Sequence, residues 1–192
     1  TSGASREPGQ VTACVIPQRA SSSTSASTGA YVRFVAMLVF IPGFMQRGEA
    51  WAQIAAAVAE RYPSTALDFR SHDFEGRIAE ILAACPPGSV PVGYSMGGRL
   101  ALHAALRAPD RFPALLTLGA SAGIEDPAAR AERQAADAEL ADWIERHPIE
   151  AVVDRWERNP VFATQPPELV GAQRPGRLSH DPRELARLLR SA

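Results

Sequence analysis

Residues 93–97 read Gly-Tyr-Ser-Met-Gly and match the pattern G-x-S-x-G. An apolar run at 90–92 precedes the pattern, and a stretch typical of a helix, 98–106, follows it. A strand, a sharp turn and a helix in this order form a nucleophile elbow, where glycines leave room for a strained serine backbone. We therefore expect the Ser95 hydroxyl to lie at the end of a buried strand and at the positive end of a helix dipole.

Strands and helices alternate over residues 35–123. Short apolar runs bounded by turn residues predict strands at 37–41, 65–69, 89–94 and 115–119. Helical spacing of apolar residues predicts helices at 48–61, 74–84 and 96–107. This alternation predicts an α/β fold with a parallel sheet and right-handed crossovers, of which 35–123 would be a partial core.

The strand signal disappears after Gly123, and residues 124–192 read as a helical block. Asp126 followed by Pro127 predicts a capped helix start, which continues through Ile144, and a second helix is expected at 148–158. Asp181 and Pro182 give the same signature, with Glu184 placed to close a capping box. Such a block typically forms a lid over the strand ends where ligands bind. The alternative is an ordinary helical subdomain.

Residues 1–34 are expected to be disordered, because a segment so rich in Ser, Thr, Ala and Gly buries too little to offset its ordering entropy. Alternatively, translation starts at Met37 and the preceding residues are an annotation artefact. The formal net charge of −1 does not suggest a nucleic-acid partner, and no apolar run is long enough for membrane insertion. Cys14 and Cys85 are expected to be free thiols in a reducing cytoplasm.

A serine hydroxyl needs a base to take its proton and donors for the oxyanion that forms. The elbow supplies one donor, the backbone N–H of Met96, and the second usually comes from the loop after an earlier strand. That loop here is Pro-Gly-Phe-Met at 42–45, so Phe44 N–H is the expected second donor.

The base is missing from the pattern. His103 lies two helical turns beyond Ser95 and cannot reach it, and His72, His147 and His180 are each expected on the surface. No strand followed by an acid, and no later histidine after a strand, is found beyond the helical block. The sequence therefore predicts that a C-terminal piece with the remaining strands, the acid and the histidine is absent from this chain.

Arg99 follows Ser95 by four positions and shares its helical face. Its guanidinium would either hold a carboxylate of a ligand or form a structural ion pair with the lid. The lid arginines are Arg130, Arg133, Arg174 and Arg177, and solvated surface charge is the simplest reading for most of them. Trp156 fits core packing and a pocket wall equally well.

The chain resembles the 2-succinyl-6-hydroxy-2,4-cyclohexadiene-1-carboxylate synthases of menaquinone biosynthesis over about residues 37–192. The resemblance rests on five motifs: GYSMGGRLAL at 93–102, GASAGI at 119–124, AERQ at 131–134, RW with NPVFA at 155–163, and RLSHDP at 177–182. It implies an α/β-hydrolase fold and a lyase that removes a ring proton and releases pyruvate. It also implies that Ser95 is the base and that the backbone N–H groups of Phe44 and Met96 form an oxyanion hole. The small substrate carries several carboxylates, and the resemblance implies that Arg99, Arg133 and Arg177 bind them. Tyr94 and Trp156 match the aromatic residues of the family's pocket.

The chain departs from this family in three ways. Pro42 stands where the family commonly has histidine, the segment 68–84 is shorter than usual, and the triad acid and histidine have no counterparts. A chain without those partners is expected to be nearly inactive. A carboxylesterase or thioesterase on the same fold, and an inactive truncated protein that binds a ligand or partner, are the alternatives. The sequence shows no metal-ligand spacing and no nucleotide-binding glycine pattern, so no cofactor is expected.

Overall fold

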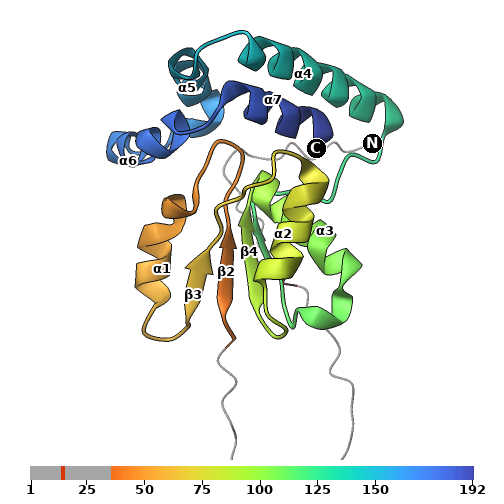
Figure 1. Cartoon of the computed structure of the whole chain (residues 1–192), viewed down its shortest axis with the longest axis vertical. Coiled ribbons are helices and arrows are strands. Elements are labelled where there is room, and N and C mark those ends of the chain that lie inside the picture. Colours follow the sequence, from red (N-terminus) through yellow and green to blue (C-terminus); the bar gives the residue numbers. More distant parts are fainter. Residues whose placement is uncertain (1–13, 16–35) are drawn as a thin grey trace, which may run out of the picture.

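The computed structural model describes residues 14–15 and 36–192, and its centre is a five-stranded sheet in the order β1-β5-β4-β2-β3 (Figure 1). The strands are β1 (Cys14–Val15), β2 (Leu38–Ile41), β3 (Ser64–Ala66), β4 (Val90–Tyr94) and β5 (Leu116–Leu118). Strands β2 to β5 pair in parallel, and β1 pairs antiparallel with β5. The nucleophile strand β4 is therefore central, with β2 and its following loop directly beside it.

Helices cover both faces of this sheet. The 3-10 helix η1 (Gly48–Trp51) and α1 (Ala52–Val58) lie on one side, and α2 (Phe74–Ala84) and α3 (Met96–Arg107) lie on the other (Figure 1). A short 3-10 turn, η2 (Pro109–Arg111), follows α3.

Alternation along β2 explains how both faces are filled, because successive side chains of a strand point to opposite sides. Val39 and Ile41 join the core with α2 and α3. Phe40 instead joins Val92 on the other face, where its ring stacks on Trp51 with the centroids 4.9 Å apart. Both faces of β2 are therefore covered, one by α2 and α3 and the other by η1 and α1.

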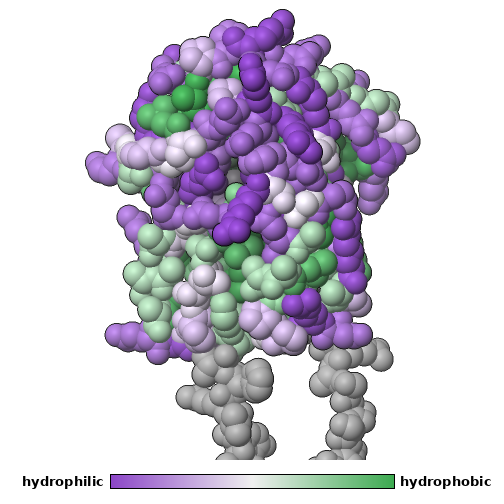
Figure 2. Space-filling model, in the orientation of Figure 1, coloured by the Kyte–Doolittle hydropathy of each residue, from purple (hydrophilic) through white to green (hydrophobic). Residues whose placement is uncertain are grey.

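A helical layer (residues 127–191) lies over the carboxyl ends of the parallel strands (Figure 1). Its elements are α4 (Pro127–Glu145), α5 (Ile149–Glu157), η3 (Pro160–Phe162), α6 (Pro167–Leu178) and α7 (Pro182–Ser191). The surface of this layer is mainly hydrophilic, whereas hydrophobic residues gather on the sheet layer below it (Figure 2). Across residues 14–15 and 36–192, no helix combines the length and the apolar character needed to cross a membrane.

Besides the cluster of Phe40, Trp51 and Val92, two larger hydrophobic clusters lie among the described residues. One joins the sheet to α2 and α3, and the other joins α4, α5 and α7 to Phe44 and Met45, which follow β2. Met96 packs against both clusters. The residue directly after Ser95 is therefore a contact point between the sheet layer and the helical layer.

Most sequence-predicted elements are confirmed. Helices α2 and α3 begin and end where expected, and the side chains of Asp126 and Asp181 accept the predicted capping bonds from Ala129 N–H at 2.9 Å and Arg183 N–H at 2.7 Å. The capping box at Glu184 is wrong, because this carboxylate pairs with His72 at 3.2 Å instead.

Several bounds and elements were not foreseen. The second parallel strand, β3, covers 64–66 rather than 65–69, and α1 ends at Val58 rather than at residue 61. Helix α6 was not expected, since its interior Pro175 argues against a helix. Disorder over all of 1–34 is wrong for Cys14–Val15, where pairing with β5 supplies backbone partners, so the sheet is not purely parallel. The other predictions for this segment lie outside the described residues.

Candidate active site

Ser95 adopts the strained backbone expected of an elbow, with φ 52° and ψ −121°. A positive φ is rare for a residue with a side chain, so surrounding bonds must hold it. Ser95 N–H donates to Leu118 O of β5 at 2.8 Å, and Ser95 O accepts from Gly98 N–H at 3.0 Å and Arg99 N–H at 3.2 Å. These bonds tie the serine to the neighbouring strand and to the first turn of α3.

Glycine is required at the elbow because backbones meet there. A Cβ on Gly97 would lie 2.5 Å from Pro42 O and still closer to Ile41 O, and a Cβ on Gly93 would lie 2.5 Å from Gly97 O. Real Cβ atoms do not approach carbonyl oxygens this closely. The start of α3 therefore packs directly on the end of β2, which brings the loop after β2 next to Ser95.

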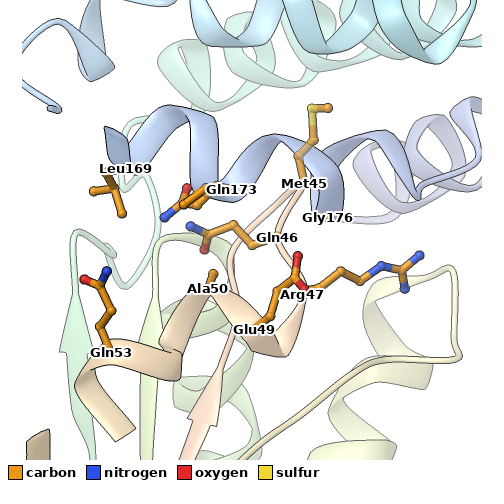
Figure 3. Close-up of a pocket in the computed structure, with 10 residues that line it drawn as sticks. Met45, Gln46, Arg47, Glu49, Ala50, Gln53, Leu169, Gln173 and Gly176 are labelled. Atoms are coloured by element: carbon orange, nitrogen blue, oxygen red, sulfur yellow. The ribbon is translucent and has the colours of Figure 1, made fainter. Parts of the chain in front are cut away.

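The loop after β2 is closed by Gln46. Gly43 N–H donates to Gln46 Oε1 at 3.0 Å, and Gln46 N–H donates back to Gly43 O at 3.2 Å. Between them, Met45 takes a positive φ of 58°. Figure 3 shows the Gln46 side chain beside Gln173, in a cavity between η1 and α6. Both ends of the turn are thus fixed by one residue.

Two backbone donors remain free near the elbow. In the part of the chain that the structure describes, neither Phe44 N–H nor Met96 N–H donates a hydrogen bond. Gly43 lies against the end of β4, since its Cβ would be 3.1 Å from Tyr94 O. The free amides, from the β2 loop and from the elbow, are what an oxyanion hole needs.

Aromatic side chains surround this loop. The Trp156 ring of α5 meets the Phe44 ring edge-on, with centroids 5.4 Å apart, and lies 5.6 Å from the Phe162 ring. Tyr94 is half-buried and packs on the core face that holds Phe40 and Trp51. Trp156 thus belongs to the packing of the helical layer and also touches the expected oxyanion loop.

Arg99 is half-buried and, among the described residues, has no carboxylate as a counter-ion. Its guanidinium carbon lies 5.0 Å from the centre of the Phe74 ring, and its Nε is buried without a hydrogen-bond partner. No carboxylate within residues 36–192 pairs with it. The structural ion pair considered from sequence is therefore not formed by the described residues.

The other two predicted arginines are already paired. Arg133 is exposed and bonds Asp137 on its own helix at 2.7 Å. Arg177 is buried, with 3% of its side chain exposed, and bonds Glu157 at 2.9 Å and Gln173 at 2.7 Å. No hydrogen bond or ion pair joins either arginine to Ser95 or Arg99 in the described chain. Sequence reasoning missed both Gln46 and Glu157, since a single polar residue in a loop or helix gives no signal of its partner.

None of the four histidines is hydrogen-bonded to Ser95 among the described residues. His72 pairs with Glu184, His103 packs edge-on against Phe74, and His147 Nδ1 lies 2.6 Å from Trp143 O. The expectation of a surface position is wrong for His180. It is buried, its Nε2 has no partner, and burial lowers its pKa to about 4, with smaller contributions from the charges of Arg47 and Arg77.

Among the described residues, Ser95 thus has the backbone expected of an elbow and the two amides expected as oxyanion donors are unpaired, but no histidine is bonded to Ser95. The described residues also contain no group of three His, Cys, Asp or Glu side chains that would suit a metal ion. Cys85 is free, as expected, and burial raises the pKa of its thiol to about 11.

Comparisons with known proteins place this geometry in a family. A family model described as alpha/beta hydrolase fold matches residues 36–155. The 2-succinyl-6-hydroxy-2,4-cyclohexadiene-1-carboxylate synthase of Enterobacter sp. (strain 638) is 32% identical over 139 residues, covering 66% of this chain and 54% of that protein. The pimeloyl-[acyl-carrier protein] methyl ester esterase of Aliivibrio salmonicida is 33% identical over 93 residues, covering 44% of this chain and 36% of that protein.

Solved structures agree on the fold. The structure of MenH from S. aureus matches with a TM-score of 0.73 and 24% identity, covering 93% of this chain and 70% of that one. The chain spans about half the length of the curated synthases that it matches. Several such synthases at about 30% identity confirm the resemblance noted from the sequence motifs. Because the family model matches more than half of the chain and the MenH structure shares its fold, the chain belongs to the alpha/beta hydrolase fold family.

Proposed function

We propose that this protein is a carbon–oxygen lyase of menaquinone biosynthesis. It would convert 2-succinyl-5-enolpyruvyl-6-hydroxy-3-cyclohexene-1-carboxylate to 2-succinyl-6-hydroxy-2,4-cyclohexadiene-1-carboxylate and pyruvate. The observation that carries the proposal is Arg99, a half-buried guanidinium without a carboxylate partner among the described residues, one helical turn from Ser95. A substrate with several carboxylates supplies the counter-ion that this arginine does not have.

The names of substrate and product define the chemistry. The ring carbon that bears the succinyl group carries a proton next to a ketone, and Ser95, once deprotonated, takes this proton. The C–H electrons move into the ring as the ring double bond shifts, and the C–O bond to the enolpyruvyl group breaks. The enolpyruvyl oxygen leaves with the bonding electrons, and the released enol becomes pyruvate. The reaction as proposed uses no metal or cofactor.

The oxyanion donors act on the same step. Removal of the proton places negative charge on the succinyl ketone oxygen, and preorganised N–H groups aimed at this atom lower the barrier. Phe44 and Met96 are assigned this role, because their amides are free among the described residues. Ser95 itself needs a proton acceptor, and within residues 36–192 none is hydrogen-bonded to it.

The other proposed substrate-binding residues are two arginines that are paired in this structure and two aromatic residues. Arg177 and Arg133 would have to exchange Glu157 and Asp137 for substrate carboxylates. Tyr94 and Trp156 are proposed as walls of the substrate pocket, since both lie against the loop that carries Phe44.

The test is pyruvate release from the enolpyruvyl substrate, followed through coupled oxidation of a nicotinamide cofactor. Measured on a full-length version of the enzyme, Ser95→Ala should abolish turnover while ligand affinity stays within about tenfold, because the serine acts mainly in the transition state. Arg99→Ala should raise KM strongly. Arg107→Ala is the matched control on the same helix, since Arg107 is exposed and pairs with Glu75 at 2.7 Å. An unchanged KM in Arg99→Ala would remove Arg99 from the carboxylate site.

Ester hydrolysis is the second candidate, favoured by the similarity to a methyl ester esterase over 93 residues. The same serine and oxyanion donors would then serve acyl transfer. Fast cleavage of p-nitrophenyl esters without pyruvate release would support this reading and contradict the lyase. Saturable substrate binding without either activity would support a protein that only binds the ligand.

A further inference from the structure

A cavity of about 260 Å³ lies between α4, α5 and the loop after β2. Its buried side is formed by Met45, Ile144 and Val152, each of which is at most 2% exposed. Neither Ser95, Tyr94 nor Arg99 lines it. The volume is just below the roughly 300–1,000 Å³ of pockets for drug-sized ligands, so a ligand of one or two rings would fit.

Two tryptophans form aromatic walls of this cavity. Trp156 reaches it from α5, and Trp143 reaches it from α4. Arg155 lies over the Trp143 ring, with its guanidinium carbon 4.3 Å from the ring centre. A cation held over an aromatic face is partly ordered before any ligand arrives, which lowers the entropy lost on binding.

The charged side chains that line the cavity are all positive. Arg155 and Arg158 line it, and no acidic side chain does. Four carboxylates of α4 and α5 are paired with arginines elsewhere in the helical layer: Asp142 and Glu145 with Arg190, and Asp154 and Glu157 with arginines of α6. Glu139 and Glu150 of the same helices form no ion pair within the described residues, and neither lines the cavity. Within the described residues, Arg155 and Arg158 form no ion pair with a carboxylate. An apolar, aromatic cavity rimmed by two uncompensated cations is complementary to a flat ring that carries an acidic group.

We propose that this cavity is a second ligand site, which shares Trp156 with the proposed substrate pocket but does not include Ser95 or Arg99, and that it binds a small aromatic or cyclic anion. The ring lies among the two tryptophans and the aliphatic floor, and its carboxylate lies at the rim with Arg155 and Arg158. The site also touches the elbow's surroundings, because Met45 forms part of the floor and Trp156 packs on Phe44. The inference does not depend on the lyase reaction, and its test needs no turnover.

Calorimetric titration with 2-naphthoate tests the proposal, with 2-naphthalenemethanol as the uncharged probe of the same ring. We expect saturable binding of one naphthoate per chain, and binding of the alcohol at least about fivefold weaker. Because both arginines are exposed, each charge contributes modestly, and Arg155→Gln/Arg158→Gln should weaken naphthoate binding by about tenfold. Raising the salt concentration should weaken naphthoate binding but not that of the alcohol.

Matched variants separate this site from general charge effects and from the elbow. Arg61→Gln/Arg183→Gln removes the same charge from exposed positions outside the cavity and should leave the affinity unchanged. Leu140→Trp should fill the cavity from α4 and abolish binding, with an unchanged circular dichroism spectrum as evidence of folding. Arg99→Gln should have no effect.

Three results would overturn the proposal: no saturable binding, equal affinity for the charged and uncharged probes, or loss of naphthoate binding in Arg99→Gln but not in Arg155→Gln/Arg158→Gln. The last result would place the anion at the elbow.

Discussion

The ion pair between Glu157 and Arg177 gives the sharpest test of the helical layer. The Arg177 side chain is 3% exposed and that of Glu157 is 13% exposed, and their bond measures 2.9 Å. Glu157→Gln keeps an oxygen that can accept a hydrogen bond but leaves a buried guanidinium without a counter-charge. Removing one partner of a buried pair typically costs about 3–5 kcal/mol. Since Gln173 still accepts a bond from Arg177 at 2.7 Å, we expect a loss of about 3 kcal/mol.

Urea unfolding at neutral pH, followed by far-UV circular dichroism and by tryptophan fluorescence, measures this loss. Arg174→Gln is the matched control. Arg174 shares the Glu157 carboxylate, but its side chain is 37% exposed, so the loss should stay below about 1 kcal/mol. Replacing both buried partners, in Glu157→Leu/Arg177→Met, should recover most of the stability lost in Glu157→Gln, because apolar residues have no charge to desolvate. Equal losses in Glu157→Gln and Arg174→Gln would refute the reasoning.

Four further outcomes are expected. Gly97→Ala should destabilise the chain severely, by more than about 3 kcal/mol in urea unfolding, because its Cβ would overlap two carbonyl oxygens; a mild effect would contradict the elbow packing. The pKa of His180 is lowered from 6.5 to about 4 in the folded chain, so on acidification the His180 imidazole is protonated in the unfolded chain before it is protonated in the folded one. The free energy of unfolding should therefore fall by up to about 3 kcal/mol as the pH is lowered from 6.5 to 4, and the full contribution of His180 should be present above pH 6.5. In thermal melts recorded over this pH range, His180→Gln should not show this part of the decrease. Mass-spectrometric labelling of the buried Cys85 thiol, whose pKa is raised to about 11, should occur only as fast as unfolding. Gln46→Met should speed amide exchange at Gly43 and lower kcat with little change in KM, whereas Gln53→Met, in the same cavity, should do neither.

The fold was predictable where local chemistry and tertiary structure agree. The G-x-S-x-G motif, the Asp126 cap and the apolar run of β2 can each be recognised from a few adjacent residues, and the structure has them as expected. The close contact that requires glycine at position 97 is long-range, since it involves the carbonyls at the end of β2. Local sequence patterns do not predict elements that depend on residues distant in the sequence. Pairing with β5 makes a strand of Cys14–Val15, and the short strand β3 ends after Ala66.

The candidate site divides in the same way. Ser95, Met96 and Phe44 follow from a motif and its loop, so their positions could be named from sequence. The partners of Arg177 and His180 could not, because they depend on side chains that only the packed structure brings near: Glu157 for Arg177, and the charges of Arg47 and Arg77 for His180. Arg133 differs, since Asp137 lies four residues later on the same helix and this spacing is visible in the sequence. Helical spacing predicted that Arg99 shares a face with Ser95, but not that its guanidinium would lie over Phe74.

Phe44 and Met45 are packed into the cluster formed by α4, α5 and α7, although they follow a strand of the sheet. The Phe44 amide, which is expected to donate to the developing oxyanion, is therefore held in place by the hydrophobic cluster of the helical layer. Partial opening of that layer, at temperatures or urea concentrations too low to melt the sheet, would already misalign this amide. On warming, loss of turnover should precede loss of the β-sheet signal, and heat inactivation would report the stability of the helical layer rather than that of the sheet.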